Sequence, residues 1–418
     1  MIYKKSISAL LYLAFFGGSV FAQVDDHCGT TSYLARKKSE VPSLENRMNS
    51  IETQTQQWVQ EHHGEKLRSF LYIPVVVHVV YKTAAQNISD AQIASEITVL
   101  NEDYSFNNPD RGWSPSVFWP ILGVPQIQFC MAERDPNGNW TAGITRTQTN
   151  VDAFTNDDKV KFDSLGGINA WPADKYLNIW VCNLGNGYLG YSSFPGFPAN
   201  IDGVVIKYTC FGRGVGALDP TYNKGRSCTH EIGHWMNLIH IWGDSNCGND
   251  YVSDTPIQLQ ANYGCPTFPH VTNCSGNAPN GDLFMDFMDY TDDRCMNMFS
   301  AGQVDRMNAS LVLTRSWIST SLSCVINSTA NLEALSNEIQ FYPNPSSCDY
   351  SITLPNYDGK DMIVDIYNLE GKKLREIKFS GIKNQKAQIS LNDLESGIYF
   401  AKVSFGDILV IRKLILQK

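Results

Sequence analysis

Three histidines and one glutamate lie within the stretch HEIGHWMNLIH, from His230 to His240. His230 and His234 are four residues apart, so on a helix both imidazoles share one face and can reach the same cation. Zinc favours nitrogen ligands of this kind, and catalytic zinc sites combine three protein ligands with one open position. Because the chain has only 8 histidines, this spacing predicts a zinc site; a helix with surface histidines is the alternative.

The third ligand is expected to be His240, which a continuing helix would carry away from the face shared by the first two histidines. The helix must therefore end, and the chain must turn back. Asparagine is second only to glycine in tolerating the left-handed backbone conformation that ends many helices. Asn237 is therefore predicted to stop the helix and to bring His240 to the metal.

Glu231 follows the first histidine and is not needed as a ligand. Its predicted role is that of the general base, which takes a proton from the metal-bound water and passes it to the leaving amine. Zinc lowers the pKa of its bound water to about 7 and polarises the carbonyl that is attacked. The motif thus predicts hydrolysis of peptide bonds.

Around this motif the pattern predicts a mixed α/β domain. Ser89 is expected to cap a helix that continues to residue 104, with apolar residues at helical spacing. Runs of β-branched and aromatic residues predict buried strands, and these runs lie at 73–81, 125–132, 176–181 and 203–208.

The N-terminal residues predict export. Lys4 and Lys5 precede a short apolar run and a small-residue cleavage site at Ala22, so residues 1–22 are expected to be a signal peptide. Neither this run nor any later one is long enough to predict a transmembrane segment. Residues 23–68, with one helix near 44–59, are expected to be a removable pro-segment.

The C-terminal region has a different texture. Residues 325–337 read as a linker, and 338–418 contain about seven short alternating segments separated by turn signals, which predicts a β-sandwich. The net charge of −9 gives no basic surface of the kind that binds nucleic acid.

Longer stretches carry a family resemblance. HEIGHWMNLIH resembles the extended zinc signature of metzincin endopeptidases, with Asn237 where glycine is usual, and FMDFMDY (284–290) resembles their Met-turn. GRSCTHEIGHWMNLIHIWGD, CGNDYVSDTP and MDYTDDRCMNMF resemble the pappalysin group. The resemblance covers about 70–324 and implies an α+β metzincin-like catalytic domain, with a mixed twisted sheet, an active-site helix and a loop-rich lower subdomain (69–324).

The resemblance implies roles for individual residues. Met288 would form an apolar, structural base under the zinc, and Tyr290 would stabilise the oxyanion through its hydroxyl; a core methionine and a packed aromatic are the alternatives. The implied disulfides are Cys247–Cys274 and Cys265–Cys295.

The number of cysteines is 11, so at least one thiol is left over or pairs elsewhere. Cys28 lies in the expected pro-segment. In related zymogens a cysteine there binds the zinc and displaces the water, which a thiolate does well. The alternatives are an ordinary exposed cysteine and a disulfide partner.

The resemblance also implies calcium, with Asp250, Asp254 and Thr255 as candidate ligands, although acidic loops are usually only solvated. Leu189, Gly190 and Tyr191 are expected in an edge strand that pairs with an extended substrate.

The pocket for the side chain after the cut is less defined by the sequence. Arg294 occupies the position where pappalysins that prefer basic residues carry an acid, although Asp292 and Asp293 are adjacent. A preference for arginine or lysine is therefore not predicted.

The C-terminal unit resembles the sorting domain of type IX secretion through FYPNP, DLESGIYFAKV and the terminal KLILQK. The resemblance implies the type IX machinery as a partner and a secreted or cell-surface protein. A carbohydrate- or protein-binding sandwich is the alternative.

Together these features predict a secreted zinc endopeptidase that is made as a zymogen and acts on proteins or peptides. Two alternatives stay open at this point: a zinc amidase acting on cell-wall peptides, and a non-catalytic adhesin. The intact Glu231 argues against the adhesin, because a scaffold needs no base beside its ligands.

Overall fold

The computed structural model divides into two compact units. The expected signal peptide (1–22) and the whole of the expected linker (325–337) lie outside the described residues. The structure describes residues 27–65, 70–274, 279–320, 339–353, 361–369, 372–381, 386–405 and 408–418. In the part described, no helix is long and apolar enough to span a membrane.

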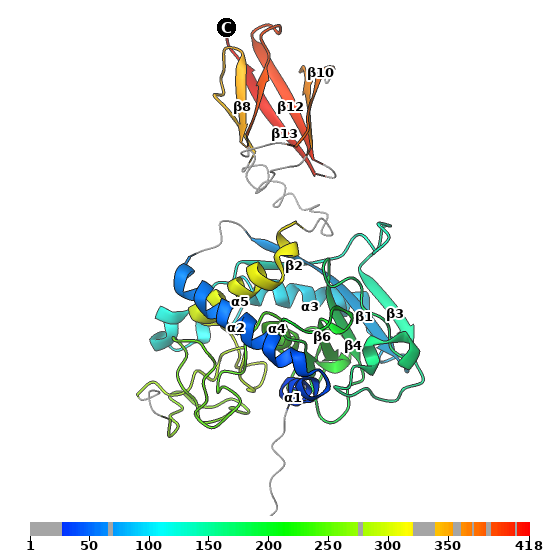
Figure 1. The fold of residues 1–418 in the computed structure, drawn as a ribbon, viewed down its shortest axis with the longest axis vertical. Coiled ribbons are helices and arrows are strands. Elements are labelled where there is room, and N and C mark those ends of the chain that lie inside the picture. Colours follow the sequence, from blue (N-terminus) through cyan, green and yellow to red (C-terminus); the bar gives the residue numbers. More distant parts are fainter. Residues whose placement is uncertain are drawn as a thin grey trace, which may run out of the picture. The chain divides into compact units, whose positions relative to one another are not determined.

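A mixed sheet forms the centre of the first unit (Figure 1). Its order is β2-β1-β4-β6-β5, with β3 also on β1; β3, β1, β4 and β6 are parallel, and β5 is an antiparallel edge strand. The strands are β1 (Leu71–Tyr81), β2 (Ile127–Met131), β3 (Ile144–Gln148), β4 (Leu177–Cys182), β5 (Gly190–Ser192) and β6 (Val204–Lys207).

The four expected strands are confirmed as β1, β2, β4 and β6. All residues of β4 and eight consecutive residues of β1 are buried, as is usual where helices and loops cover both faces of a parallel sheet. Strand β3 was not predicted, because its residues, ITRTQ, are mostly polar and only partly buried.

Five α-helices are described, and two belong to the expected pro-segment. α3 begins at the expected cap, where the Ser89 side chain accepts a hydrogen bond from the backbone N–H of Gln92. α5 begins with a capping box formed by Ser300 and Gln303. The bounds are α1 (Thr30–Glu40), α2 (Pro42–His62), α3 (Asp90–Asp103), α4 (Arg226–Trp235) and α5 (Ala301–Thr314).

The two N-terminal helices pack on the rest of the first unit. α2 lies along α5 (Figure 1), and α1 contacts β5. Tyr33 of α1 and Leu44 of α2 are fully buried in a core cluster that includes Trp180 and Tyr191. The expected pro-segment therefore completes part of the hydrophobic core.

Between α4 and α5 the described residues contain no helix and no ladder strand. Turns, buried carboxylates and the two expected disulfides, Cys247–Cys274 and Cys265–Cys295, hold this region together. It is the loop-rich lower subdomain that the family resemblance implied.

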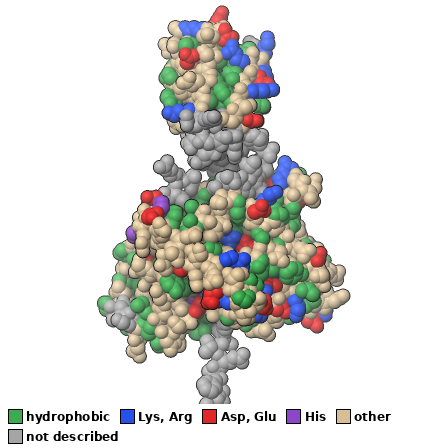
Figure 2. Space-filling view, viewed as in Figure 1, with side chains coloured by type: hydrophobic (Ala, Val, Ile, Leu, Met, Phe, Trp, Pro, Cys, Tyr) green, Lys and Arg blue, Asp and Glu red, His purple; other side chains and the backbone are tan. Residues whose placement is uncertain are grey.

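The second unit contains the expected sandwich. Its strands form two antiparallel sheets, ordered β10-β9-β12-β13 and β11-β8-β7, around a core that includes Tyr350, Val364 and Leu414. The strands are β7 (Gln340–Tyr342), β8 (Asp349–Thr353), β9 (Met362–Tyr367), β10 (Lys373–Phe379), β11 (Lys386–Ser390), β12 (Gly397–Phe405) and β13 (Ile408–Leu416). On the face of the molecule shown in Figure 2, acidic and basic side chains are interspersed.

Candidate active site

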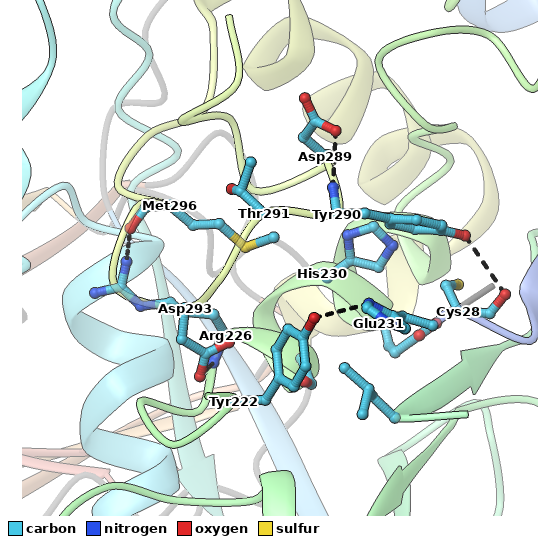
Figure 3. Close-up of a pocket in the computed structure, with 13 residues that line it drawn as sticks. Cys28, Tyr222, Arg226, His230, Glu231, Asp289, Tyr290, Thr291, Asp293 and Met296 are labelled. Atoms are coloured by element: carbon cyan, nitrogen blue, oxygen red, sulfur yellow. Dashed lines mark hydrogen bonds between the residues drawn. The ribbon is translucent and has the colours of Figure 1, made fainter. Parts of the chain in front are cut away.

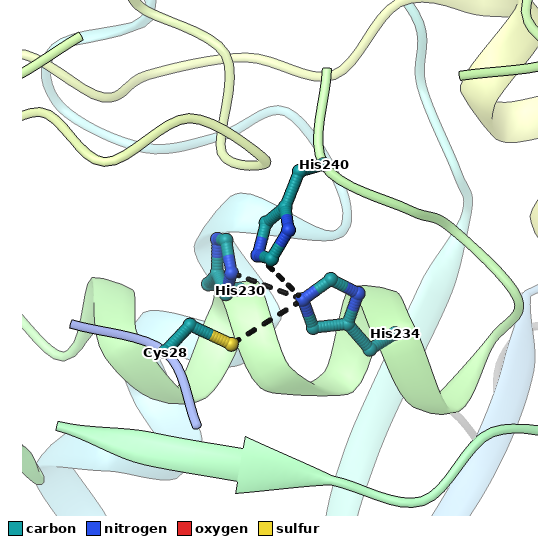
Figure 4. A group of neighbouring side chains, drawn as sticks. All are labelled: Cys28, His230, His234 and His240. Carbon is teal, nitrogen blue, oxygen red and sulfur yellow. Dashed lines mark hydrogen bonds between the residues drawn. The ribbon is translucent and has the colours of Figure 1, made fainter. Parts of the chain in front are cut away.

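Helix α4 and the turn after it bring the three histidines together (Figure 4). The Nε2 atom of His234 lies 3.1 Å from that of His230 and 3.2 Å from that of His240. Asn237 has φ 71°, the left-handed conformation expected of the residue that ends the helix. All three imidazoles are buried.

Cys28 completes the group. Its Sγ atom lies 3.5 Å from Nε2 of His234, and the ligand atoms of Cys28 and the three histidines all lie within 4.8 Å of one another. Tetrahedral zinc with ordinary bond lengths would separate two nitrogens by about 3.3 Å and a nitrogen from a sulfur by about 3.5 Å. These side chains therefore fit a zinc ion.

Contacts of the Nδ1 atoms fix the orientation of each histidine ring. Nδ1 of His230 lies 2.7 Å from the carbonyl of Phe287, and Nδ1 of His234 lies 2.8 Å from the carbonyl of Leu238. Nδ1 of His240 contacts the carboxylate of Asp244 instead. Each contact requires the proton on Nδ1 and leaves Nε2 free as a donor to a metal.

Two of the histidines, His230 and His234, are also held neutral, as metal ligands must be. Burial, followed by the charge of His240, lowers the pKa of His230 to about 3. The same two causes lower the pKa of His234 well below its ordinary value.

Backbone pairing to the edge strand holds Cys28 in place. Gly29 donates to the carbonyl of Gly190 at 2.9 Å, and Leu189 donates to the carbonyl of His27 at 2.8 Å. The expected edge strand therefore does pair with an extended segment, and in this structure that segment is the chain's own N-terminal part. Burial, followed by the nearby Glu231 carboxylate, raises the pKa of the Cys28 thiol.

Glu231 is buried beside the histidines and contacts the same segment. The hydroxyl of Thr30 donates to Oε2 of Glu231 at 2.9 Å and accepts from the backbone N–H of Ser192 at 3.0 Å. A Cβ at Gly190 would lie 2.7 Å from Cγ of Glu231. Glycine is thus required at position 190 for the glutamate to pack against the edge strand.

Met288 packs against Gly233 of helix α4, next to the predicted ligand His234. It is fully buried, and a Cβ at Gly233 would lie 2.4 Å from its Sδ atom. This close approach fixes the distance between the helix and the loop that carries Met288.

Tyr290 follows on that loop and points its hydroxyl toward Cys28 (Figure 3). The hydroxyl donates to the Cys28 carbonyl at 3.5 Å, and the ring packs edge-on to His240 at 4.9 Å between centroids.

A pocket opens beside this group (Figure 3). Leu189, Tyr222, Asp289 and Asp293 are among the residues that line it. Burial raises the pKa values of Asp289 and Asp293 to about 6.

Two of the expected substrate-binding residues lie away from this pocket. The side chain of Arg294 is 67% exposed and pairs with Asp292, so its neighbour Asp293 takes the position in the pocket wall. Tyr191 is buried in the core against Tyr33.

The calcium candidates make hydrogen bonds within the protein. Asp250 accepts from the hydroxyl of Thr255 at 2.7 Å, whereas Asp254 accepts from Ser300 and from the backbone N–H of Gly302 at the start of α5. Among the described residues, the only group of three or more His, Cys, Asp and Glu side chains close enough to share an ion is the one around His234. The calcium assignment stays a prediction.

Sequence reasoning did not identify Thr30 and Asp244. Asp244 follows His240 by four residues in HIWGD, and Thr30 follows Cys28 by two in CGTT. Thr31 adds a further link, because its hydroxyl donates to Asp244 at 3.2 Å. Short polar residues next to a predicted ligand were the signal available for both.

Comparisons with known proteins found matches for both units of the chain. Residues 162–312 match the sequence profile of the family described as pregnancy-associated plasma protein-A, and residues 340–417 match that of a secretion system C-terminal sorting domain. An extracellular metalloprotease from Arthroderma otae is 30% identical over 253 residues, covering 58% of this chain and 78% of that relative.

Two solved structures from Tannerella forsythia are similar as well. Mature mirolysin in complex with a cleaved peptide is 52% identical, with a TM-score of 0.58, and the match covers 60% of this chain and 95% of that one. A promirolysin mutant is 47% identical, with a TM-score of 0.63, and the match covers 69% of this chain and 95% of that one.

Proposed function

The chain belongs to the pappalysin family of metalloproteases, and from that premise we propose that it is a zinc endopeptidase that its own N-terminal segment (23–68) keeps latent. The matched sorting domain and the extracellular relatives make it an exported protein. One observation carries the proposal: residues 28–30 contact a zinc-type ligand group, the predicted base and the predicted oxyanion donor at once.

His230, His234 and His240 would hold the zinc, with Cys28 as the fourth ligand in the latent form. A bound zinc ion supplies Lewis-acid polarisation of a carbonyl and lowers the pKa of a coordinated water. The residues' own contribution is orientation, since each outer nitrogen is fixed by a carbonyl or carboxylate.

Glu231 would act as the general base. In the latent form its Oε2 atom accepts a hydrogen bond from the Thr30 hydroxyl at 2.9 Å. Once Thr30 leaves, the same oxygen can take a proton from the attacking water and deliver it to the leaving nitrogen.

Tyr290 would stabilise the negative charge that develops on the scissile carbonyl oxygen. Its hydroxyl already donates to a peptide carbonyl, that of Cys28. In the latent form the pro-segment carbonyl thus occupies the position proposed for the substrate's carbonyl.

The relatives support latency and the substrate class. The match to promirolysin covers more of this chain (69%) than the match to mature mirolysin (60%), as expected if an N-terminal segment is removed on maturation. The mature relative is in complex with a cleaved peptide, which favours proteins and peptides as substrates here. The proposed catalytic domain is 69–324, and the proposed sorting domain, 338–418, would engage the type IX machinery.

The test uses the full chain after removal of the pro-segment, with wild type and Glu231→Ala compared on denatured protein and zinc content measured in both. The proposal expects equal zinc and cleavage by the wild type alone, with a loss of at least about a hundredfold in the variant. Equal cleavage by both would reject Glu231 as the base. Zinc without protein cleavage, but with cleavage of cell-wall peptides, would replace the endopeptidase with an amidase.

A further inference from the structure

The first helix of the pro-segment inserts one aromatic side chain deep into the catalytic unit. Tyr33 is fully buried, and its hydroxyl donates to Oδ1 of Asp158 at 2.8 Å. Its ring packs on Tyr191 and Phe197, at 5.0 and 5.5 Å between centroids. We call the site formed by Asp158, Lys161, Tyr191 and Phe197 the phenol pocket.

A buried ion pair forms the polar end of the phenol pocket. Nζ of Lys161 lies 3.0 Å from Asp158, and the lysine side chain is 0% exposed. The same Nζ lies 3.4 Å from the Tyr33 hydroxyl and 5.1 Å from the centre of its ring. Carboxylate and ammonium thus both contact the bound phenol.

The ion pair is not explained by stability alone. Apolar residues of similar volume hold a core as well as a buried ion pair does, or better, whereas a phenol needs a hydrogen-bond partner when it is buried. The pocket therefore has the chemistry of a receptor for tyrosine rather than for phenylalanine.

Every residue of the phenol pocket belongs to the proposed catalytic domain, whereas its occupant Tyr33, and Lys37, which pairs with Asp158 at 2.8 Å, come from the pro-segment. The pocket also adjoins the active site, because Tyr191 follows Gly190, the residue that packs on Glu231. A polypeptide held along β5 can consequently reach the catalytic groups and the pocket together.

We propose that, once the pro-segment has left, the phenol pocket binds a tyrosine side chain of the polypeptide substrate outside the cleaved bond. The proposal rests on the proposed function, since it requires a peptidase whose pro-segment is removed. It adds a recognition site for a phenolic side chain that the metal centre and the pocket beside Asp293 do not provide.

The first test is binding to the matured full chain. The probe is the synthetic peptide SYLARKKSE, residues 32–40, which carries Tyr33 but neither Cys28 nor Thr30. Calorimetry should give weaker binding by about tenfold for the Tyr33→Phe peptide, which loses a hydrogen bond to a charged group, and no measurable binding for Tyr33→Ala. Equal binding of all three peptides, or of none, overturns the proposal.

The second test asks whether substrates use the pocket. Two long peptides that share one cleavage sequence and differ only in a distant tyrosine or alanine are compared, beside a short peptide that spans the cleavage sequence alone. The tyrosine peptide should have a KM about tenfold lower at unchanged kcat, and SYLARKKSE should raise that KM without affecting the short peptide. Identical KM values would mean that the pocket binds only the pro-segment, which contradicts the proposal.

A protein variant provides the matched control. Asp158→Asn keeps the shape of the side chain and suits the left-handed backbone at this position, where φ is 67°. It removes the negative charge of the carboxylate that accepts the hydrogen bond from the phenol. In the binding series it should reduce the difference in affinity between SYLARKKSE and its Tyr33→Phe form, and an undiminished difference would contradict the role given to Asp158. If the matured wild type cleaves no peptide, the proposed function fails, and the binding series alone decides the pocket.

Discussion

The two halves of the active site are built in different ways. His230, Glu231 and His234 lie on one helix, α4, so their relative positions follow from helix geometry. His240, Met288 and Tyr290 lie on segments without regular structure, held by turns, disulfides and hydrogen bonds to buried carboxylates such as Asp289. The helix half is local in sequence, whereas the loop half depends on contacts over long sequence distances.

One buried side chain joins the halves. Arg226 begins α4, pairs with Asp103 at 3.1 Å and Asp110 at 3.0 Å, and donates to the carbonyl of Met296 in the loop half at 2.6 Å. Its guanidinium also lies over the ring of Phe287. Because the loop half depends on such long-range contacts, we expect it to be less stable than the helix half. We also expect changes in the loop half to leave α4 intact.

The largest effect is expected from cutting this link. Arg226→Met should lower the free energy of unfolding by about 3–5 kcal/mol, because the buried carboxylate of Asp103 loses its cationic partner and that of Asp110 keeps only Lys224. Arg294→Met is the matched control: the Arg294 pair with Asp292 is exposed, so its loss should cost at most about 0.5 kcal/mol. Denaturant unfolding measures both, and equal effects would show that Arg226 does not join the halves.

Removing a disulfide should loosen the loop half alone. Cys247 and Cys274 are 27 residues apart, and a loop of that length gives a crosslink stabilisation of about 3–4 kcal/mol. The double change to serine should speed hydrogen exchange around His240 and weaken zinc binding, while exchange in α4 stays slow. Equally fast exchange in α4 would refute the separation of the two halves.

The loop half should also make stability depend on pH. Burial raises the pKa of Asp289 from 3.8 to about 6, so the folded state keeps a proton that the unfolded state releases. This contribution is present below about pH 4 and is lost as pH rises to about 6, by up to about 3 kcal/mol. Between pH 4 and 7, the free energy of unfolding should change less steeply with pH in Asp289→Asn than in the wild type. An equal slope would show that Asp289 does not cause this pH dependence.

The smallest effect is expected at the junction of the halves. Asn237→Ala should destabilise the protein by about 1 kcal/mol more than Asn237→Gly, because φ of 71° is costly for a residue with a Cβ and free for glycine. Both variants lose the same contact with Thr55, so the comparison isolates the backbone. A more stable alanine variant would mean that the turn relaxes.

The same division explains what could be predicted. Helical spacing identified His230, Glu231 and His234. The need for a turn after the helix identified Asn237, because both signals depend on neighbours within a few residues. The apolar runs of β1 and β4 and the alternation in the sandwich predicted strands for the same local reason. Met288, Tyr290 and Cys28 were found only through the family resemblance.

Other features depend on tertiary contacts that no local pattern reveals. Asp244 and Thr30 are ordinary polar residues until folding brings them to His240 and Glu231. Helix α1 lacks an apolar stripe and was not predicted, because the core it joins through Tyr33 belongs to another part of the chain. Asp293, rather than Arg294, lines the pocket because the loop turns between them.

The central claim is a zinc centre to which both halves contribute and which Cys28 closes. X-ray absorption at the zinc edge, on the unprocessed full chain, tests it most directly. The account predicts three nitrogen ligands and one sulfur, with the sulfur lost in Cys28→Ser and after maturation while the three nitrogens remain. An unprocessed chain whose zinc has no sulfur ligand, or fewer than three nitrogens, would contradict it.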